Sequence, residues 1–86
     1  MMSPEQCRAA RAWLGWTQQD LASHARVGLS TIKEFENSGR RTIAATLGAM
    51  QQALERAGVI FLSDTDGKPT GIMVSPIGYP GLQYER

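Results

Sequence analysis

The chain has 86 residues, 42% of them hydrophobic and 20% charged, and a formal net charge of +1. This composition indicates one small globular domain, for which oligomerisation is the natural additional source of stability. One cysteine and one histidine exclude an internal disulfide and a Cys/His metal cluster, so we expect neither a metal nor another cofactor. Because the chain has no apolar run of membrane-spanning length and its start is unlike a signal peptide, we expect a cytoplasmic protein.

Two helix starts are predicted early in the chain, each marked by a hydroxyl side chain that can cap free N–H groups. Ser3 and Gln6 can form a capping box, and Gly15 is a typical helix end. Thr17 caps the second helix, with Asp20 in its first turn. The inward-facing residues of this second helix are Leu21, Ala22 and Ala25.

A third helix is predicted over residues 29–37, after a break in the apolar periodicity at residues 26–28. Only about three residues separate it from the second helix, which is the length of the turn in a helix-turn-helix. A helical wheel places Ile32 and Phe35 inward, with Thr31 and Glu36 beside them. The outward arc collects Leu29, Ser30, Lys33, Glu34 and Asn37.

The polar side chains of this outward arc have the hydrogen-bonding chemistry to read base edges in a DNA major groove. Lysine can donate to guanine, glutamate can accept from cytosine, and serine can do either. The alternative is that these side chains are simply solvated, as on the outer face of most helices. The arc alone does not decide between the two interpretations.

The remaining elements are a regular fourth helix and a β-hairpin. We expect Thr42 to cap the helix and Gly58 to end it. The inward positions of the helix are Ile43, Leu47, Met50, Leu54 and Ala57. Two apolar runs, 59–62 and 72–74, flank an Asp/Gly/Pro cluster that favours a hairpin turn over the start of a calcium loop. The chain therefore divides into residues 1–58, a hairpin over 59–75 and an irregular tail over 76–86.

Four single residues are interpreted from their surroundings. Cys7 lies on an inward helical face and is expected in the core, as is the large aromatic Trp16. Trp13 lies on the next helical stripe and is expected to be half-exposed. His24 has no second His or Cys nearby, so a surface or capping role is favoured over metal binding.

The second and third helices carry a spaced set of residues without insertions: Thr17-Gln18-Gln19-Asp20-Leu21-Ala22, then Ala25, Val27, Thr31-Ile32 and Glu36. This set resembles the helix-turn-helix of the phage Cro/CI repressor type, or XRE family, over about residues 6–57. The resemblance implies a mainly α, four-helix lambda-repressor-like domain that binds double-stranded DNA as a homodimer. The implied function is sequence-specific transcription regulation, as a repressor on a palindromic operator.

The resemblance also implies roles for particular residues. The outward arc of the third helix would read bases, and Arg11 and Glu36 would form a buried ion pair. The contacts to DNA phosphates would come from Thr17, Gln18, Gln19, Arg40 and Arg41. Two positions depart from the family: Arg26 stands where the turn usually has glycine, and Gly28 stands where a Ser or Thr cap is usual.

The hairpin is the expected dimerisation element, because its strands are apolar on successive residues and one small domain covers only one of its faces. The residues concerned are Val59, Ile60, Phe61, Leu62, Ile72, Met73 and Val74. The alternative function is a protein-interaction module, such as an antitoxin or antiactivator that grips a second protein with this hairpin. An enzyme is not expected, since the sequence offers no pairing of catalytic residue types, phosphate loop or metal cluster.

Overall fold

The computed structural model describes residues 1–38 and 42–75. Over these residues the chain forms four helices and a two-stranded antiparallel sheet. The helices are α1 (Pro4–Leu14), α2 (Gln18–Ala25), α3 (Leu29–Ser38) and α4 (Ala44–Arg56), and the strands are β1 (Val59–Ser63) and β2 (Pro69–Val74). The expected mainly α fold with a C-terminal hairpin is confirmed at this level. The predictions for Arg40, Arg41 and the tail over 76–86 concern residues outside the described ranges.

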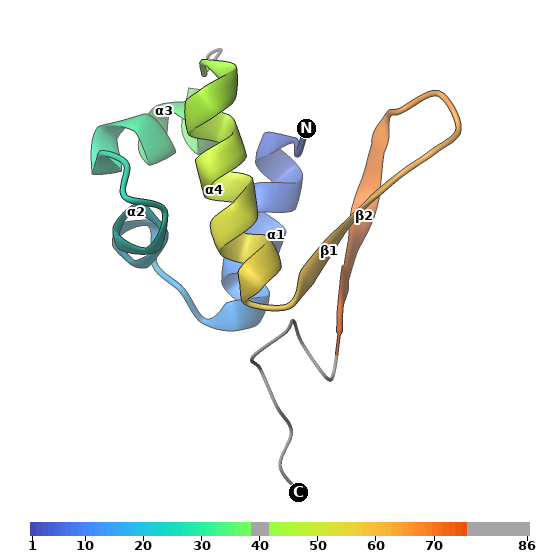
Figure 1. Ribbon diagram of the computed structural model, residues 1–86, viewed down its shortest axis with the longest axis horizontal. Coiled ribbons are helices and arrows are strands. Elements are labelled where there is room, and N and C mark those ends of the chain that lie inside the picture. The colour runs from blue at the N-terminus through green and yellow to red at the C-terminus, as the bar shows by residue number, and fades with distance from the viewer. Residues whose placement is uncertain (39–41, 76–86) are drawn as a thin grey trace, which may run out of the picture.

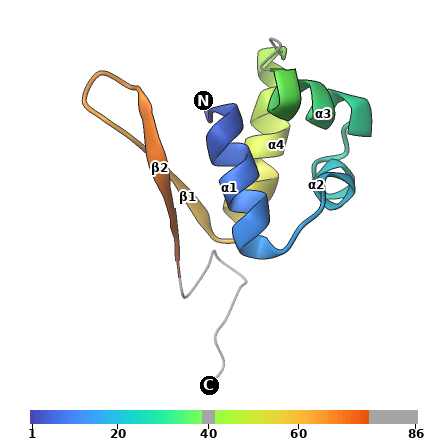
Figure 2. The same ribbon diagram turned by 180° about the vertical axis from the view of Figure 1, so that it is seen from behind.

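The helices α1 and α4 lie side by side in the middle of the molecule, with α2 and α3 on one side and the hairpin on the other (Figure 1). The view from behind shows the same order (Figure 2). The helix α2 contacts both α3 and α4, while β1 contacts α4 and β2 contacts α1. The hairpin is thus packed against the two central helices and away from the α2–α3 pair. Among the described helices, none is long and apolar enough to cross a membrane.

The predicted capping box at Ser3 and the predicted Thr17 cap are both confirmed, and Asp20 completes a second capping box. At the start of α1, Ser3 Oγ accepts from the Gln6 N–H at 3.1 Å, and Gln6 Oε1 accepts from the Ser3 N–H at 2.9 Å. At the start of α2, Thr17 Oγ1 accepts from the Asp20 N–H at 2.9 Å, and Asp20 Oδ2 accepts from the Thr17 N–H at 2.8 Å. Gly15 ends α1 with left-handed φ of 72°. Local chemistry alone therefore sets the boundaries of this part of the chain.

The turn between α2 and α3 contains a strained residue. Arg26 has φ 61° and ψ 45°, the left-handed conformation that glycine adopts most easily, and it is the one non-glycine residue with positive φ in the described ranges. This conformation costs roughly 1 kcal/mol for a residue with a Cβ. In return the Arg26 N–H donates to the Ala22 carbonyl and ends α2. The position usually held by glycine in the resembled family thus has the backbone that favours glycine.

The start of α4 differs from the prediction. The helix is capped by Ile43 rather than Thr42, and no side chain hydrogen-bonds at this cap. Ile43 is 71% exposed instead of inward, because its backbone is extended and its side chain does not follow the helical period. Further along, Met50 and Leu54 are fully buried, as the periodicity predicts.

The core is built from apolar side chains of all four helices and β1, together with Met2 before α1. Its buried members are Met2, Cys7, Ala10, Leu21, Ala22, Ala25, Ile32, Phe35, Met50, Ala53, Leu54 and Val59. Four of these are alanines, which let helix backbones approach closely. Cys7 is completely buried, as expected for a small apolar residue.

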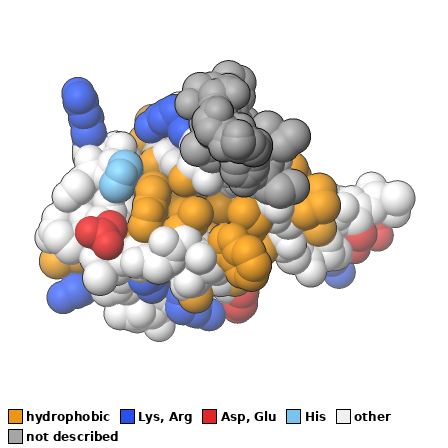
Figure 3. All heavy atoms as spheres, turned by 90° about the horizontal axis from the view of Figure 1, so that it is seen from below, with side chains coloured by type: hydrophobic (Ala, Val, Ile, Leu, Met, Phe, Trp, Pro, Cys, Tyr) orange, Lys and Arg blue, Asp and Glu red, His pale blue; other side chains and the backbone are white. Residues whose placement is uncertain are grey.

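The two tryptophans lie at the edge of the core or outside it. Trp16 is only partly buried; it packs against the core and stacks on His24 with a ring-centroid distance of 4.1 Å. The exposed His24 ring also contacts the Asp20 carbonyl through Nδ1 at 2.8 Å, which agrees with a surface role. Trp13 is 68% exposed. Seen from below, hydrophobic side chains gather over the middle of the molecule and reach the base of the hairpin (Figure 3).

The hairpin is held by its turn and by one glutamine of α1. At the turn, Asp64 Oδ1 accepts from the N–H groups of Asp66 and Lys68, each at 2.9 Å, which confirms the turn interpretation of this cluster. The buried Gln6 side chain donates through Nε2 to the carbonyls of Leu62 at 2.9 Å and Gly71 at 2.7 Å, one on each strand. Gln6 therefore links the start of α1 to both strands at once.

Candidate nucleic-acid interface

The outer face of α3 is polar and exposed. Four of the five residues predicted for the outward arc are exposed: Ser30, Lys33, Glu34 and Asn37. Leu29 is the exception, because it is partly buried and packs against the core, as does the neighbouring turn residue Val27. The helix therefore presents hydrogen-bonding groups to solvent from its first turn to its last. Leu29, the one apolar residue predicted to read bases, is partly buried.

The inner face of α3 fixes how this outer face is presented. Ile32 is completely buried and Phe35 is 6% exposed, so both fill the core. Glu36, predicted to lie beside them, is only 2% exposed. Burying a carboxylate costs several kcal/mol unless it is paired and hydrogen-bonded. The position of α3 in the fold is therefore stable only if Glu36 has partners for its buried charge.

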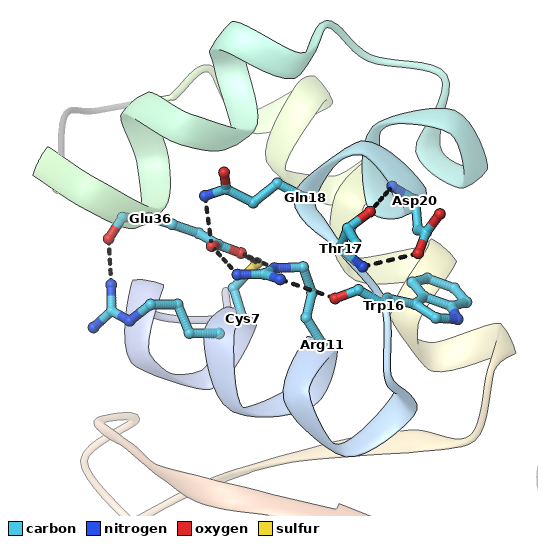
Figure 4. Close-up of polar contacts among 8 residues, drawn as sticks. Cys7, Arg11, Trp16, Thr17, Gln18, Asp20 and Glu36 are labelled. Carbon is cyan, nitrogen blue, oxygen red and sulfur yellow. Dashed lines mark hydrogen bonds and ion pairs between the residues drawn. The ribbon is translucent and has the colours of Figure 1, made fainter.

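Arg11 of α1 forms a two-point ion pair with Glu36 (Figure 4). Its Nε donates to Glu36 Oε2 at 2.7 Å, and its Nη2 donates to Glu36 Oε1 at 2.6 Å. The Glu36 side chain is fully buried and the Arg11 side chain is 16% exposed. Arg11 Nη1 also donates to the Trp16 carbonyl at 2.9 Å, in the link between α1 and α2. The resemblance implied this pair, and the geometry adds that it joins α1 to both α3 and the α1–α2 link.

Three further groups converge on Glu36. Cys7 Sγ donates to Oε2 at 3.0 Å, and Gln18 Nε2 donates to Oε1 at 3.1 Å. Arg8 Nη1 donates to the main-chain carbonyl of Glu36, near the C-terminal end of α3 where a positive charge suits the helix dipole. Glu36 thus connects α1, α2 and α3. We call Glu36 with Cys7, Arg11 and Gln18 the polar hub.

These contacts determine the protonation states of the groups in the polar hub. Burial by itself raises the pKa of Glu36, but the hydrogen bonds from Arg11, Cys7 and Gln18 and the charge of Arg11 outweigh it, so the pKa is lowered. Burial, followed by the hydrogen bond and the charge of Glu36, raises the pKa of the Cys7 thiol. The hydrogen bond to Glu36 raises the pKa of Arg11. The carboxylate is therefore ionised, and the thiol stays protonated as a donor.

The start of α2 is the second part of the candidate interface. The first N–H groups of a helix have no acceptor within it, and the capping box satisfies that of Asp20. The N–H groups of Gln18 and Gln19 are left at the positive end of the helix, where an anion is favoured. The Gln18 side chain, expected on a phosphate, donates to Glu36, and Gln19 Nε2 donates to Ser23 Oγ at 3.2 Å. At the start of α2, the main-chain N–H groups of Gln18 and Gln19 are therefore better placed to donate to a phosphate than the side-chain amides of these residues.

Sequence reasoning missed the contacts of Cys7 and Arg8 with Glu36. The signal available was the spacing of Cys7 and Arg11, which are four residues apart on one helical face. Nothing in the spacing of Arg8 indicates its bond to the end of α3. Arg40 and Arg41, the remaining expected phosphate contacts, lie outside the described ranges. Comparison of the chain with protein-family models gives no match, and comparison with curated proteins gives none either.

Proposed function

We propose that this protein is a sequence-specific DNA-binding regulator, in which α2 and α3 form a lambda-repressor-like helix-turn-helix and α3 is the recognition helix. The observation that carries the proposal is the contrast between the two faces of α3. Its inner face is anchored by Ile32, Phe35 and the polar hub, whereas its outer face offers four exposed polar side chains. A short helix held rigidly with such a face outward suits entry into a major groove.

Base reading is assigned to the exposed arc of α3. Lys33 can donate to the O6 and N7 acceptors of guanine, and Glu34 can accept from the N4 amino group of cytosine. Asn37 can bond adenine on two atoms, and Ser30 can act as donor or acceptor. Leu29 contributes at most an apolar contact to a thymine methyl, since much of its side chain packs on the core.

Phosphate contacts are assigned to the start of α2 and to the segment after α3. The N–H groups of Gln18 and Gln19 form a small anion site, with the Thr17 hydroxyl beside them. Arg40 and Arg41 would hold the backbone on the other side of α3. Two copies on a palindromic operator would place the half-sites one helical turn, roughly 34 Å, or a multiple of it apart. Such binding over a promoter represses transcription by occupancy.

Selection of bound sequences from random DNA tests this function. We expect a palindromic consensus and a mobility shift of that sequence by the full chain. Glu34→Ala and Lys33→Ala should alter the consensus while leaving the thermal midpoint unchanged, because both side chains are exposed. Recovery of no consensus, with equal binding of all fragments, would exclude sequence-specific regulation.

A protein-interaction module remains the second candidate, favoured by the exposed apolar residues of the hairpin. Leu62 is 38% exposed and Met73 is 51% exposed. An antitoxin or antiactivator of this kind would bind its partner through the hairpin. Two results together would favour this candidate. The wild type would bind no selected DNA, and a protein that co-purifies with the wild type would be lost when Leu62 and Met73 are replaced by polar residues.

A further inference from the structure

The helices cover the inner face of the hairpin unevenly. Side chains alternate along a strand, so Val59 of β1 shares this face with Ile72 and Val74 of β2. Val59 is fully buried, whereas Ile72 and Val74 are only half-buried although they pack against the core. The helices therefore cover β1 more completely than β2, and part of the apolar surface of β2 stays open.

A groove of about 240 Å³ lies between α1 and β2, where this cover is incomplete. Glu5 and Ala9 line it on the helix, and Thr70 and Ile72 line it on the strand. Ala9 is exposed, as is Trp13, one helical turn further along the same side of α1. We call this space the α1–β2 groove. It offers an apolar surface bordered by one edge of the sheet.

The main chain of β2 at this edge is oriented to bond a further strand. Within the described residues, β2 pairs with β1 alone. The Ser75 N–H donates to the Gly58 carbonyl at 2.9 Å, so these two residues form a hydrogen-bonded pair. Because hydrogen-bonded and non-bonded pairs alternate in an antiparallel ladder, the peptide groups of Ile72 and Val74 point away from β1. A strand laid on this edge would therefore bond to these two residues.

The chain that follows β2 has the residue pattern of a turn and then of a strand. Ser75-Pro76-Ile77-Gly78 has serine, proline and glycine at the first, second and fourth positions, where a type I turn favours them. Beyond the turn, Pro80, Leu82 and Tyr84 alternate with Gly81, Gln83 and Glu85. Such alternation of apolar with small or polar residues is typical of a strand that has one covered face.

We propose that residues 80–84, which lie outside the described ranges, fold back antiparallel to β2 and fill the α1–β2 groove as a third strand. Residues directly opposite each other share a face. The apolar set therefore faces the groove when Leu82 lies opposite Ile72 and Pro80 lies opposite Val74. Residues 75–79 then form the connection, and five-residue hairpin loops are most often built around a type I turn.

This register also suits the proline. Pro80 stands at the first position of the strand, where its missing N–H is tolerated. A shift of two residues would set Pro80 opposite Ile72 and leave the Ile72 carbonyl without its N–H donor. In the proposed register Leu82 instead exchanges both main-chain hydrogen bonds with Ile72 and covers the exposed Ala9, while Tyr84 follows toward the hairpin turn.

The chain's own segment is favoured as the occupant because it is attached beside the edge that it covers. A short tether gives an effective concentration in the millimolar range, well above that of a separate partner at micromolar concentration. Covering the edge also removes a template for unwanted strand pairing. The outer face of the hairpin, with Leu62 and Met73, stays open in this arrangement. The inference is thus independent of the proposed DNA binding.

Nuclear magnetic resonance of the full, isotopically labelled chain without DNA tests the position of the segment. We expect nuclear Overhauser contacts from the Leu82 methyl groups to Ala9 and Ile72. The Ile72 N–H should be protected from exchange with solvent, because the third strand must open before it exchanges. Contacts and protection should be the same at about 20 and about 200 µM chain, since docking within one chain does not depend on concentration.

Two variants separate the groove-facing side chain from its neighbour. Leu82→Ser removes the apolar group from the groove, and exchange of the Ile72 N–H should accelerate about tenfold or more as the strand opens. Gln83→Ser, the matched control, changes the next residue on the solvent face and should exchange like the wild type. The Met73 N–H, which points to β1, should stay equally protected in all three chains and so report an intact hairpin.

Three results would each overturn the inference. The first is a wild type without contacts between Leu82 and Ala9, and the second is a Leu82→Ser variant whose Ile72 N–H exchanges no faster than that of the wild type. The third is protection of Ile72 that grows with chain concentration, which would assign the edge of β2 to a separate molecule. Because no DNA is present, none of these results bears on the DNA-binding proposal.

Discussion

Replacing Glu36 by alanine should strongly destabilise the fold, because Glu36 is the acceptor at the centre of the polar hub. The substitution removes the acceptor of four side-chain hydrogen bonds, two from Arg11 and one each from Cys7 and Gln18. Arg11, whose side chain is only 16% exposed, would keep its charge with no counter-ion in place. Removing one partner of a buried ion pair costs about 3–5 kcal/mol. Since small domains are stable by about 5–15 kcal/mol, Glu36→Ala should unfold a large share of the molecules on mild heating.

Urea denaturation followed by circular dichroism measures this loss, with Glu34→Ala as the matched control. The control changes the same residue type two positions earlier on the same helix, but at an exposed site, and should stay within about 0.5 kcal/mol of the wild type. A free energy of unfolding for Glu36→Ala that equals that of the control would refute the assignment of the polar hub as the anchor of α3.

The same pair predicts a pH dependence. The pKa of Glu36 is lower in the folded protein than the ordinary value of about 4.3 expected in the unfolded chain. Its ionisation therefore stabilises the fold above that ordinary value, and the stabilisation is lost as the pH falls through the folded pKa. Glu36→Gln should be less stable than the wild type at pH 7, and the difference should shrink below about pH 4. A difference that stays constant across this range would contradict the paired carboxylate.

Three further predictions concern the DNA contacts and the turn. Glu34→Ala should relax preference at one base pair of each half-site, with discrimination falling by about 1–3 kcal/mol in binding assays on single-base operator variants. Arg41→Ala should weaken operator and scrambled DNA alike and lower the slope of log affinity against log salt by about 1; an unchanged slope would mean that it touches no phosphate. Arg26→Gly should raise the free energy of unfolding by up to about 1 kcal/mol, because glycine adopts the left-handed conformation without a steric cost. Arg26→Ala, which keeps a Cβ, should bring no such gain in urea denaturation.

The elements that could be predicted from the sequence are those decided by neighbours along the chain. A capping box such as that of Thr17 and Asp20 is complete within four residues, so its hydrogen bonds follow from residue types and spacing. The same holds for the Asp64 turn, where one carboxylate oxygen accepts from the N–H groups two and four residues further along the chain. Inward positions in the middle of helices were also predictable, because a regular period continues on both sides. At helix starts the helical period gave wrong predictions. Ile43 was predicted to face inward but is exposed, and Leu29 was predicted to face outward but is partly buried.

What the sequence by itself determined is therefore the order of helices and strands, most of their ends, and the polar outer arc of α3. Only the tertiary structure decided which groups meet in the polar hub, because Cys7, Arg11 and Gln18 come from two other helices and reach Glu36 across gaps of 18 to 29 residues. Gln18 illustrates the difference. Its place at the start of a helix was evident, but the direction of its amide depends on a buried charge that only folding brings beside it. A buried carboxylate is stable only when it is hydrogen-bonded, so it accepts from the donors that lie close to it. Which donors lie close is decided by tertiary packing rather than by local sequence.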